Sequence, residues 1–344
     1  MNYNLTASQK TFEAIDPPSE YYIELDDLLN GKYTNKFEGF LVIKNVFPHE
    51  TIDSLRKDYF SLFNGDYEYD GNEWTHVKKS KLSHGVGLHP STVFVRSKSF
   101  HNFIELSILK ELSAALLHSD ESVLCPRAIL RSFSHFSSRC TLAHRDVDYF
   151  SSLDDTNVVT TWIPLGPADE HHGQLIYLKD SHKNISTISK LVKDDKTITS
   201  DLKNLADRLG TTWYMPTLSK GDIMVHCLNT VHASFDTNNI IPRVLCDLLF
   251  LPSTSTGKYI ESYNTTGTSF VFFINESSTN RIVVTFTTTF DVTNQFVHIA
   301  FTYDGSTNAS GLKMFLNGVE QTSKTVTSDT LTATTRLAVD TDFG

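Results

Sequence analysis

The chain has 344 residues and a formal net charge of -10. Its hydrophobic share of 40% is that of an ordinary globular protein. The acidic balance excludes a nucleic-acid binder that works through a broad basic surface. No apolar run reaches transmembrane length and residues 1–10 are polar, so we expect no membrane partner. Four scattered cysteines without a CxxC pair favour reduced thiols, and we expect a cytoplasmic protein.

The N-terminal third predicts one short strand and two helices. Residues 40–43 are a short apolar run and form the candidate strand. Between Thr51 and Phe63, apolar residues recur every three or four positions, as they do along one face of a helix. The same spacing continues from Phe100 to Leu117 and predicts a second helix.

From Cys125 onward the pattern changes to short apolar strands separated by turn residues. A polar stretch, residues 190–209, which is a candidate helix, interrupts the series. Many short strands with turns between them favour a sandwich or a jelly roll. The predicted fold is mainly β with flanking helices: a double-stranded β-helix (jelly roll) plus a C-terminal β-sandwich-like extension. The candidate strands are residues 128–133, 158–165, 175–178, 223–226, 231–235 and 244–250.

The composition changes abruptly after Pro252. All cysteine, proline and tryptophan residues precede that point, whereas the remainder is rich in threonine and has one histidine, His298. Residues 253–257 have the Ser/Thr/Gly composition of a linker. We therefore predict two domains, residues 1–252 and residues 258–344.

The candidate chemistry begins at His144 and Asp146. In an extended segment, residues two apart point to the same face, so an imidazole and a carboxylate would lie side by side. These are two of the three ligands of a 2-His-1-carboxylate triad for non-haem iron. A later segment, residues 221–235, contains a further histidine, His232, followed by Ser234.

Residues 231–235 and 243–250 are predicted to form a hairpin that turns at residues 236–239. Its centre is equally far from His232 and Arg243, which would place the two opposite each other on one face. An arginine there suits a dicarboxylate co-substrate, because its planar fork grips a carboxylate and stays charged when partly buried. Ser234 lies on the same face and offers a hydroxyl to the same carboxylate.

These motifs resemble those of the phytanoyl-CoA dioxygenase family over about residues 30–250. The likeness includes TWIPLG at residues 161–166, GQLIYL at 173–178, DSH at 180–182, and the segments 39–46 and 221–243. The resemblance implies that His144, Asp146 and His232 bind Fe(II) and act in catalysis. It also implies that Arg243 and Ser234 hold the C5 carboxylate of 2-oxoglutarate.

The function implied by this resemblance is that of a dioxygenase. It would use O2 and 2-oxoglutarate to hydroxylate a small or lipid-like organic substrate, releasing succinate and CO2. The alternative is a cupin-like jelly roll that keeps a metal but only binds ligands, with its C-terminal region mediating carbohydrate binding or adhesion. Arg243 separates the two, since a mere metal-binding jelly roll has no need of a carboxylate clamp.

Three polar residues near these motifs keep two interpretations each. His226 either supports a metal ligand or is a buried, hydrogen-bonded histidine unrelated to the site. Arg131 and His135, on the strand before His144, point either into the pocket or away from it.

The C-terminal region resembles a laminin-G/concanavalin A-like lectin. Residues 295–305 alternate and end at an Asp-Gly turn, and residues 312–316 lead into Asn317-Gly318, a type I′ hairpin signal. Only about 80 residues are available, fewer than the roughly 100 of a complete sandwich. The region is either a carbohydrate-binding module or a generic β-rich extension that covers a sheet edge.

Overall fold

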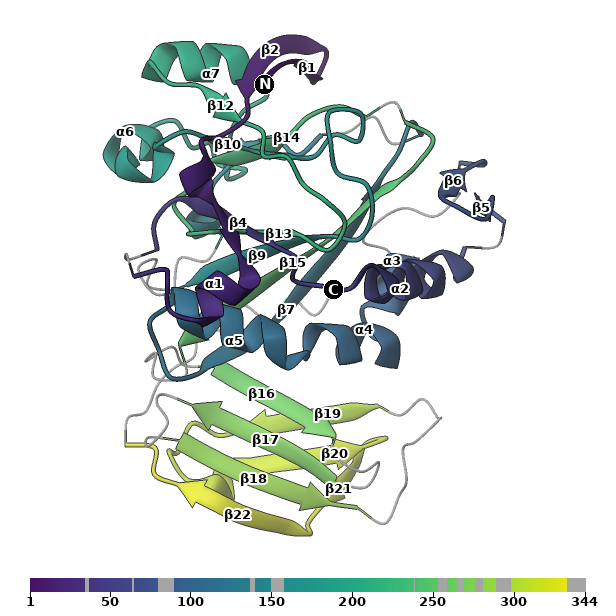
Figure 1. The fold of residues 1–344 in the computed structure, drawn as a ribbon. Helices are drawn as coiled ribbons and strands as arrows, with labels where there is room; N and C mark the ends of the chain where they lie inside the picture. Colours follow the sequence, from purple (N-terminus) through teal and green to yellow (C-terminus); the bar gives the residue numbers. More distant parts are fainter. Residues whose placement is uncertain are drawn as a thin grey trace. The chain divides into compact units, whose positions relative to one another are not determined.

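The computed structural model describes residues 1–34, 37–63, 65–79, 90–136, 140–149, 158–237, 239–252, 259–264, 269–275, 281–288 and 298–332. The chain divides into two compact units, Met1–Pro252 and Ser253–Gly344 (Figure 1). The linker expected at residues 253–257 lies outside the described residues. Among the described helices, none is both long enough and apolar enough to cross a membrane.

The first unit is built on two β-sheets between which the chain passes repeatedly. The seven-stranded sheet contains β1 (Asn2–Ala7), β2 (Lys10–Ile15), β12 (Trp213–Tyr214), β10 (Leu175–Leu178), β14 (His232–Ser234), β8 (Ala143–His144) and β11 (Thr197–Thr199), in that order. The six-stranded sheet contains β3 (Tyr22–Glu24), β4 (Phe40–Lys44), β13 (Ile223–His226), β9 (Val159–Pro164), β15 (Arg243–Pro252) and β7 (Ser122–Phe133). This alternation is the predicted jelly roll, which is confirmed.

The central strands of the six-stranded sheet are buried on both faces. Ile163, Val225 and Cys246 belong to the core that the helices cover, whereas Trp162 and Met224 pack toward Tyr177 of the other sheet. This alternation follows from the two-residue period of a strand. One face therefore anchors helices, and the other is free to form the wall of a cavity between the sheets.

Helices cover one face of the six-stranded sheet (Figure 1). They are α1 (Leu25–Leu29), α2 (His49–Ser61), α3 (Pro90–Phe94), α4 (Lys98–Ile104) and α5 (Ser107–Leu116). The helix predicted at residues 51–63 is confirmed as α2. The single helix predicted from Phe100 to Leu117 is wrong, because Leu106 is extended, with φ -54° and ψ 132°, and separates α4 from α5. Buried apolar residues continue at helical spacing on both sides of the break, so their spacing could not reveal it.

Two segments differ from the expected strand pattern. The N-terminal hairpin of β1 and β2 was not predicted. The polar stretch 190–209 contains β11 and then α7 (Leu202–Leu209), and α6 (Ile185–Ser189) precedes it. Asp201 caps α7 by accepting a hydrogen bond from the Asn204 amide, and Gly210 ends it with φ 61°. Both are standard helix-boundary residues.

The second unit is a two-layered β-structure with its own core. One sheet contains β16 (Tyr259–Asn264), β17 (Ser269–Asn275), β18 (Arg281–Thr287) and β22 (Lys324–Asp329); the other contains β19 (Ile299–Tyr303), β20 (Leu312–Leu316) and β21 (Val319–Gln321). Phe272 and Val284 of the first sheet belong to one apolar cluster with Leu312 and Met314 of the second. Asn317 and Gly318 have φ of 49° and 80°, as a type I′ turn requires. Residues 295–297 of the lectin-like motif lie outside the described residues.

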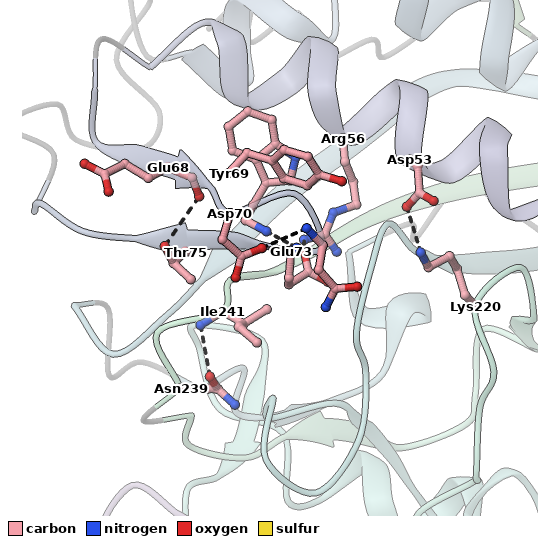
Figure 2. Close-up of polar contacts among 12 residues, drawn as sticks. Asp53, Arg56, Glu68, Tyr69, Asp70, Glu73, Thr75, Lys220, Asn239 and Ile241 are labelled. Atoms are coloured by element: carbon pink, nitrogen blue, oxygen red, sulfur yellow. Dashed lines mark hydrogen bonds and ion pairs between the residues drawn. The ribbon is translucent and has the colours of Figure 1, made fainter.

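A buried ion pair attaches α2 to a small hairpin, β5 (Tyr67–Tyr69) and β6 (Trp74–His76), in the first unit (Figure 2). Arg56 is only 2% exposed and pairs with Glu73, next to the turn of that hairpin. Burial lowers the pKa of Arg56, and the charge of Glu73 opposes that shift. Gly166 makes room for the guanidinium, since a Cβ there would lie 1.4 Å from Nη1.

Replacing Glu73 by alanine should destabilise the first unit by about 3–5 kcal/mol, because it leaves the buried Arg56 cation without its partner. The matched control is Asp53→Ala. Asp53 lies on the same helix as Arg56, and its replacement breaks an exposed ion pair with Lys220 (Figure 2). That loss should be about 0–1 kcal/mol. All tryptophans precede Pro252, so fluorescence during urea unfolding reports on the first unit alone. Equal losses for the two variants would contradict the prediction.

Candidate metal centre

Three side chains with metal-binding atoms converge between the sheets: His144, Asp146 and His232. His144 and His232 are direct cross-strand partners on β8 and β14, which brings their rings to 4.2 Å between centroids. Asp146 follows β8 and begins a short 3₁₀ helix, Asp146–Asp148. Its Oδ1 lies 3.8 Å from Nε2 of His144 and 3.6 Å from Nε2 of His232. The three ligand atoms lie within 4.8 Å of one another, close enough to share one cation.

The backbone orients both histidines for binding through Nε2. Nδ1 of His144 donates to the Leu142 carbonyl at 2.8 Å, and Nδ1 of His232 donates to the Thr230 carbonyl at 3.0 Å. A carbonyl oxygen can only accept, so Nδ1 carries the proton in both rings and Nε2 keeps its lone pair. Such hydrogen bonds fix the ring and tautomer of a metal-binding histidine.

The second carboxylate oxygen of Asp146 is held by two residues of the six-stranded sheet. Thr160 donates to Oδ2 at 2.8 Å, and Nε2 of His226 lies 3.1 Å from the same atom. Nδ1 of His226 lies 3.0 Å from the Tyr177 hydroxyl. His226 is thus both a buried, hydrogen-bonded histidine and a support for Asp146, which joins the two interpretations that the sequence left open.

The electrostatics favour the protonation states that bind a cation. Burial lowers the pKa of His144 and, more strongly, that of His232, so both imidazoles are neutral at neutral pH. Burial opposes ionisation of Asp146, but His232 and the His226 hydrogen bond outweigh it and hold the pKa of this carboxyl below its ordinary value. Two neutral imidazoles and one carboxylate are the donor set of non-haem Fe(II).

Arg243 is a buried cation whose partner is missing from the described part of the chain. It is 1% exposed, and among the described residues its Nε and Nη1 have no hydrogen-bond partner. Burial lowers its pKa to about 9, so it is charged at neutral pH. Its guanidinium carbon lies 4.5 Å from the Phe133 ring centroid. Because an unpaired buried charge is costly, this arrangement suits an anionic ligand.

Ser234 can supply a second donor to such a ligand. Its Oγ accepts a hydrogen bond from the Thr141 amide at 2.7 Å, and its own hydroxyl proton remains available. Ser234 and Arg243 line the same cavity as the three candidate ligands.

The hairpin predicted to place His232 opposite Arg243 is wrong. β14 pairs with β8 and β10, whereas β15 pairs with β7 and β9 of the other sheet. The residues that link the two strands therefore cross from one sheet to the other, and His232 and Arg243 line the cavity from different sheets. Asn238 of the expected turn lies outside the described residues.

The lining of the cavity settles the orientation that the sequence left open for Arg131 and adds one residue, Asp247, that the sequence did not indicate. Arg131 is part of it, whereas His135 is not among the lining residues and lies against Phe136. Asp247 was not foreseen, although it is the one acidic residue within the apolar strand β15. The lining residues are Ile129, Arg131, Thr141, His144, Asp146, Thr160, Trp162, Leu175, His226, His232, Ser234, Arg243, Leu245, Asp247, Leu248 and Leu249.

Two protein families match the chain in sequence. The phytanoyl-CoA dioxygenase (PhyH) family matches residues 37–243, and the concanavalin A-like lectin/glucanases superfamily matches residues 242–342. A search of curated proteins found no significant match.

Several solved structures are similar to the chain. One is the non-heme alpha ketoglutarate dependent epimerase SnoN from nogalamycin biosynthesis, with 13% identity, a TM-score of 0.45, and coverage of 67% of this chain and 84% of SnoN. Another is EctD from S. alaskensis, with 15% identity, a TM-score of 0.45, and coverage of 74% of this chain and 85% of EctD. A third is the non-heme monooxygenase ThoJ, with 14% identity, a TM-score of 0.44, and coverage of 66% and 78%.

Proposed function

The chain belongs to the phytanoyl-CoA dioxygenase family of Fe(II)- and 2-oxoglutarate-dependent oxygenases, and we propose that it hydroxylates a small or lipid-like organic substrate. In this proposal His144, Asp146 and His232 bind the iron, and Arg243 and Ser234 bind 2-oxoglutarate. The observation that carries it is the buried guanidinium of Arg243, whose Nε and Nη1 have no hydrogen-bond partner among the described residues, in the same cavity as the His-Asp-His cluster.

The residues present fit both groups. Nε2 of each histidine and Oδ1 of Asp146 are the atoms left free to bind iron, because the other polar atoms of these side chains are already hydrogen-bonded. Three protein ligands leave positions for a co-substrate and O2. When bound, iron and 2-oxoglutarate together supply the activation of O2, with succinate and CO2 as the products of the co-substrate.

The remaining residues of the cavity position these groups and exclude water. Thr160 and His226 keep the Asp146 carboxylate in one orientation, which fixes the direction of its free oxygen. Arg243 and Ser234 would orient 2-oxoglutarate by its far carboxylate. Trp162, Leu175 and Leu245 supply apolar walls. A protein that only captured a ligand at a metal would have no use for Arg243.

The test is substrate-stimulated succinate release. Protein loaded anaerobically with Fe(II) and 2-oxoglutarate is exposed to O2 in the presence of pools of small organic and lipid-like compounds. At least one pool should stimulate succinate release, and mass spectrometry should find one oxygen atom added to a compound of that pool. The His232→Ala protein is the control. Succinate release no greater than in this control, with every pool, would refute the proposal.

We also propose that the two units have separate tasks, with residues 1–252 as the catalytic domain and residues 258–344 as a carbohydrate-binding, lectin-like domain. Every residue that lines the cavity precedes Pro252. The lectin match begins at residue 242, but β15 pairs with β7 and β9 along its length, so the boundary belongs after this strand.

We also propose that the protein is cytoplasmic. Its four free cysteines support this location, because thiols stay reduced there.

A chain that ends at Thr256 should stay folded and bind Fe(II) and 2-oxoglutarate as the full chain does, because the strands and ligands of the jelly roll are complete without the second unit. It should lose any binding that the full chain shows on a glycan array. Thermal unfolding, 2-oxoglutarate affinity and array binding of the two proteins check this. Unfolding or loss of co-substrate binding on truncation would mean that the second unit is part of the catalytic domain.

A further inference from the structure

Two charged residues of the cavity have no task in the chemistry proposed above: Arg131 on β7 and Asp247 on β15. Arg131 pairs in register with Leu245, and Ile129 pairs with Asp247, so Arg131 and Asp247 are diagonal neighbours on one face of the sheet. That face is the one that lines the cavity with His144, Asp146 and His232. Both charges therefore face the space in which a substrate would meet the iron.

Among the described residues neither side chain forms a hydrogen bond, and no nitrogen of Arg131 lies within 4 Å of an oxygen of Asp247, although their charges act on each other through the cavity. Burial raises the pKa of Asp247 to about 6, an increase that the charge of Arg131 limits, so it is mostly a carboxylate at neutral pH. The neighbours of Asp247 along β15 are apolar, namely Cys246 and Leu248. Asp247 is half-buried and lines the cavity, and a carboxylate held there among apolar neighbours without a bonded cation costs stability, which points to a ligand that uses it.

The charges of the other groups already balance among themselves. The two positive charges of Fe(II) are matched by Asp146 and by one carboxylate of 2-oxoglutarate, and Arg243 is matched by the other carboxylate. Arg131 and Asp247 then remain as one positive and one negative charge for the primary substrate.

We infer that the primary substrate is a small zwitterion of the amino-acid type, with its carboxylate on Arg131 and its ammonium group on Asp247. The inference rests on the proposed function and narrows its substrate class. A lipid-like hydrocarbon would fill the cavity without a counter-charge for either residue, and a simple carboxylic acid or amine would leave one of the two without a counter-charge. Two anchoring points of opposite sign also fix the orientation of a small molecule, which hydroxylation of one carbon requires.

The experiment uses the full chain, loaded anaerobically with Fe(II) and 2-oxoglutarate so that no turnover occurs. The probes are the standard L-amino acids, each compared with its decarboxylated amine and with the acid that lacks the amino group. Binding is read from the shift of the visible Fe(II)–2-oxoglutarate absorbance and from the thermal midpoint. At least one amino acid should bind at least about ten-fold more tightly than both of its partial analogues, since each charge-assisted contact contributes about ten- to a hundred-fold.

Two variants that each remove one charge separate the two contacts. Arg131→Gln should lose the preference for the amino acid over the amine, and Asp247→Asn should lose the preference over the acid. Both should bind 2-oxoglutarate and Fe(II) as the wild type does. The matched controls are Lys203→Gln and Asp207→Asn, which remove the same charges from an exposed ion pair on α7 and should change nothing.

Three results would overturn the inference. If the wild type binds iron and 2-oxoglutarate but no amino acid binds better than its analogues, the substrate class is wrong and the proposed function stands. If Arg131→Gln weakens 2-oxoglutarate binding instead, Arg131 serves the co-substrate. If the wild type gives no Fe(II)–2-oxoglutarate absorbance, both the proposed function and the inference fail.

Discussion

Replacing His232 by alanine should abolish the visible absorbance that Fe(II) and 2-oxoglutarate produce together in the absence of O2, and with it all succinate release. His232 is buried, and its Nδ1 bond to the Thr230 carbonyl aims Nε2 toward Oδ1 of Asp146. Alanine removes one of the three proposed ligands and leaves an apolar gap in its place. The same loss is expected for His144→Ala and Asp146→Ala. Anaerobic titration with Fe(II), followed by absorbance, measures it.

Replacing His226 should weaken Fe(II) binding less than replacing His232 does. Its ring lies 4.5 Å from that of His232, but its Nε2 is engaged by Asp146, so it should not replace the missing ligand. His226→Phe should weaken Fe(II) binding by about 10- to 100-fold without abolishing the absorbance at high iron concentration, since partners of ligands usually have effects of this size. His171→Ala, at an exposed histidine outside the cavity, should have no effect. Full absorbance in the His232→Ala protein would remove this residue from the triad.

Replacing Arg243 by methionine should have opposite effects on binding and on stability. The affinity for 2-oxoglutarate should fall by about 3–5 kcal/mol, or roughly a hundred- to several-thousand-fold, because a buried charge pair loses one partner. Fe(II) binding should change little, since Arg243 is not a candidate ligand. The free energy of unfolding without co-substrate should rise by about 1–4 kcal/mol, because an apolar side chain replaces a buried cation beside Phe133 that has no ion-pair partner among the described residues.

Isothermal titration with 2-oxoglutarate and urea unfolding followed by tryptophan fluorescence measure the two effects. Arg208→Met, at an exposed arginine on α7, is the control and should leave both quantities unchanged. An unchanged 2-oxoglutarate affinity in Arg243→Met would mean that the carboxylate clamp lies elsewhere. A large loss of stability would mean that Arg243 has a structural partner.

The sequence was most informative where chemistry and strand period coincide. His144 and Asp146 stand two apart at the end of a strand, and the structure brings both to His232. The bounds predicted for β10 and β13 agree with the structure, because these strands are short, apolar and flanked by turn residues. Local pattern and local structure depend on the same residues in these cases.

The errors arose where the outcome depends on the partner of a strand or helix. The spacing of His232 and Arg243 is symmetrical about a turn, but symmetry does not tell whether two strands share a sheet. Apolar spacing continued across Leu106, although the chain bends there so that two short helices can pack separately. The bonds of His226 and the position of Asp247 at the cavity depend on residues far apart in the sequence, so neither could be predicted from sequence neighbours.

The candidate iron site draws on both sheets of the jelly roll at once. Two of its ligands are neighbours in the seven-stranded sheet, whereas the residues that hold the third, Thr160 and His226, belong to the six-stranded sheet. A metal ion at this position would connect the two sheets. A ligand that binds only the folded state stabilises it, and the stabilisation grows with the logarithm of the free ligand concentration once that concentration exceeds the Kd. We therefore expect the lifetime of the protein in a cell to follow the supply of iron, with the empty form removed first by proteases when iron is scarce.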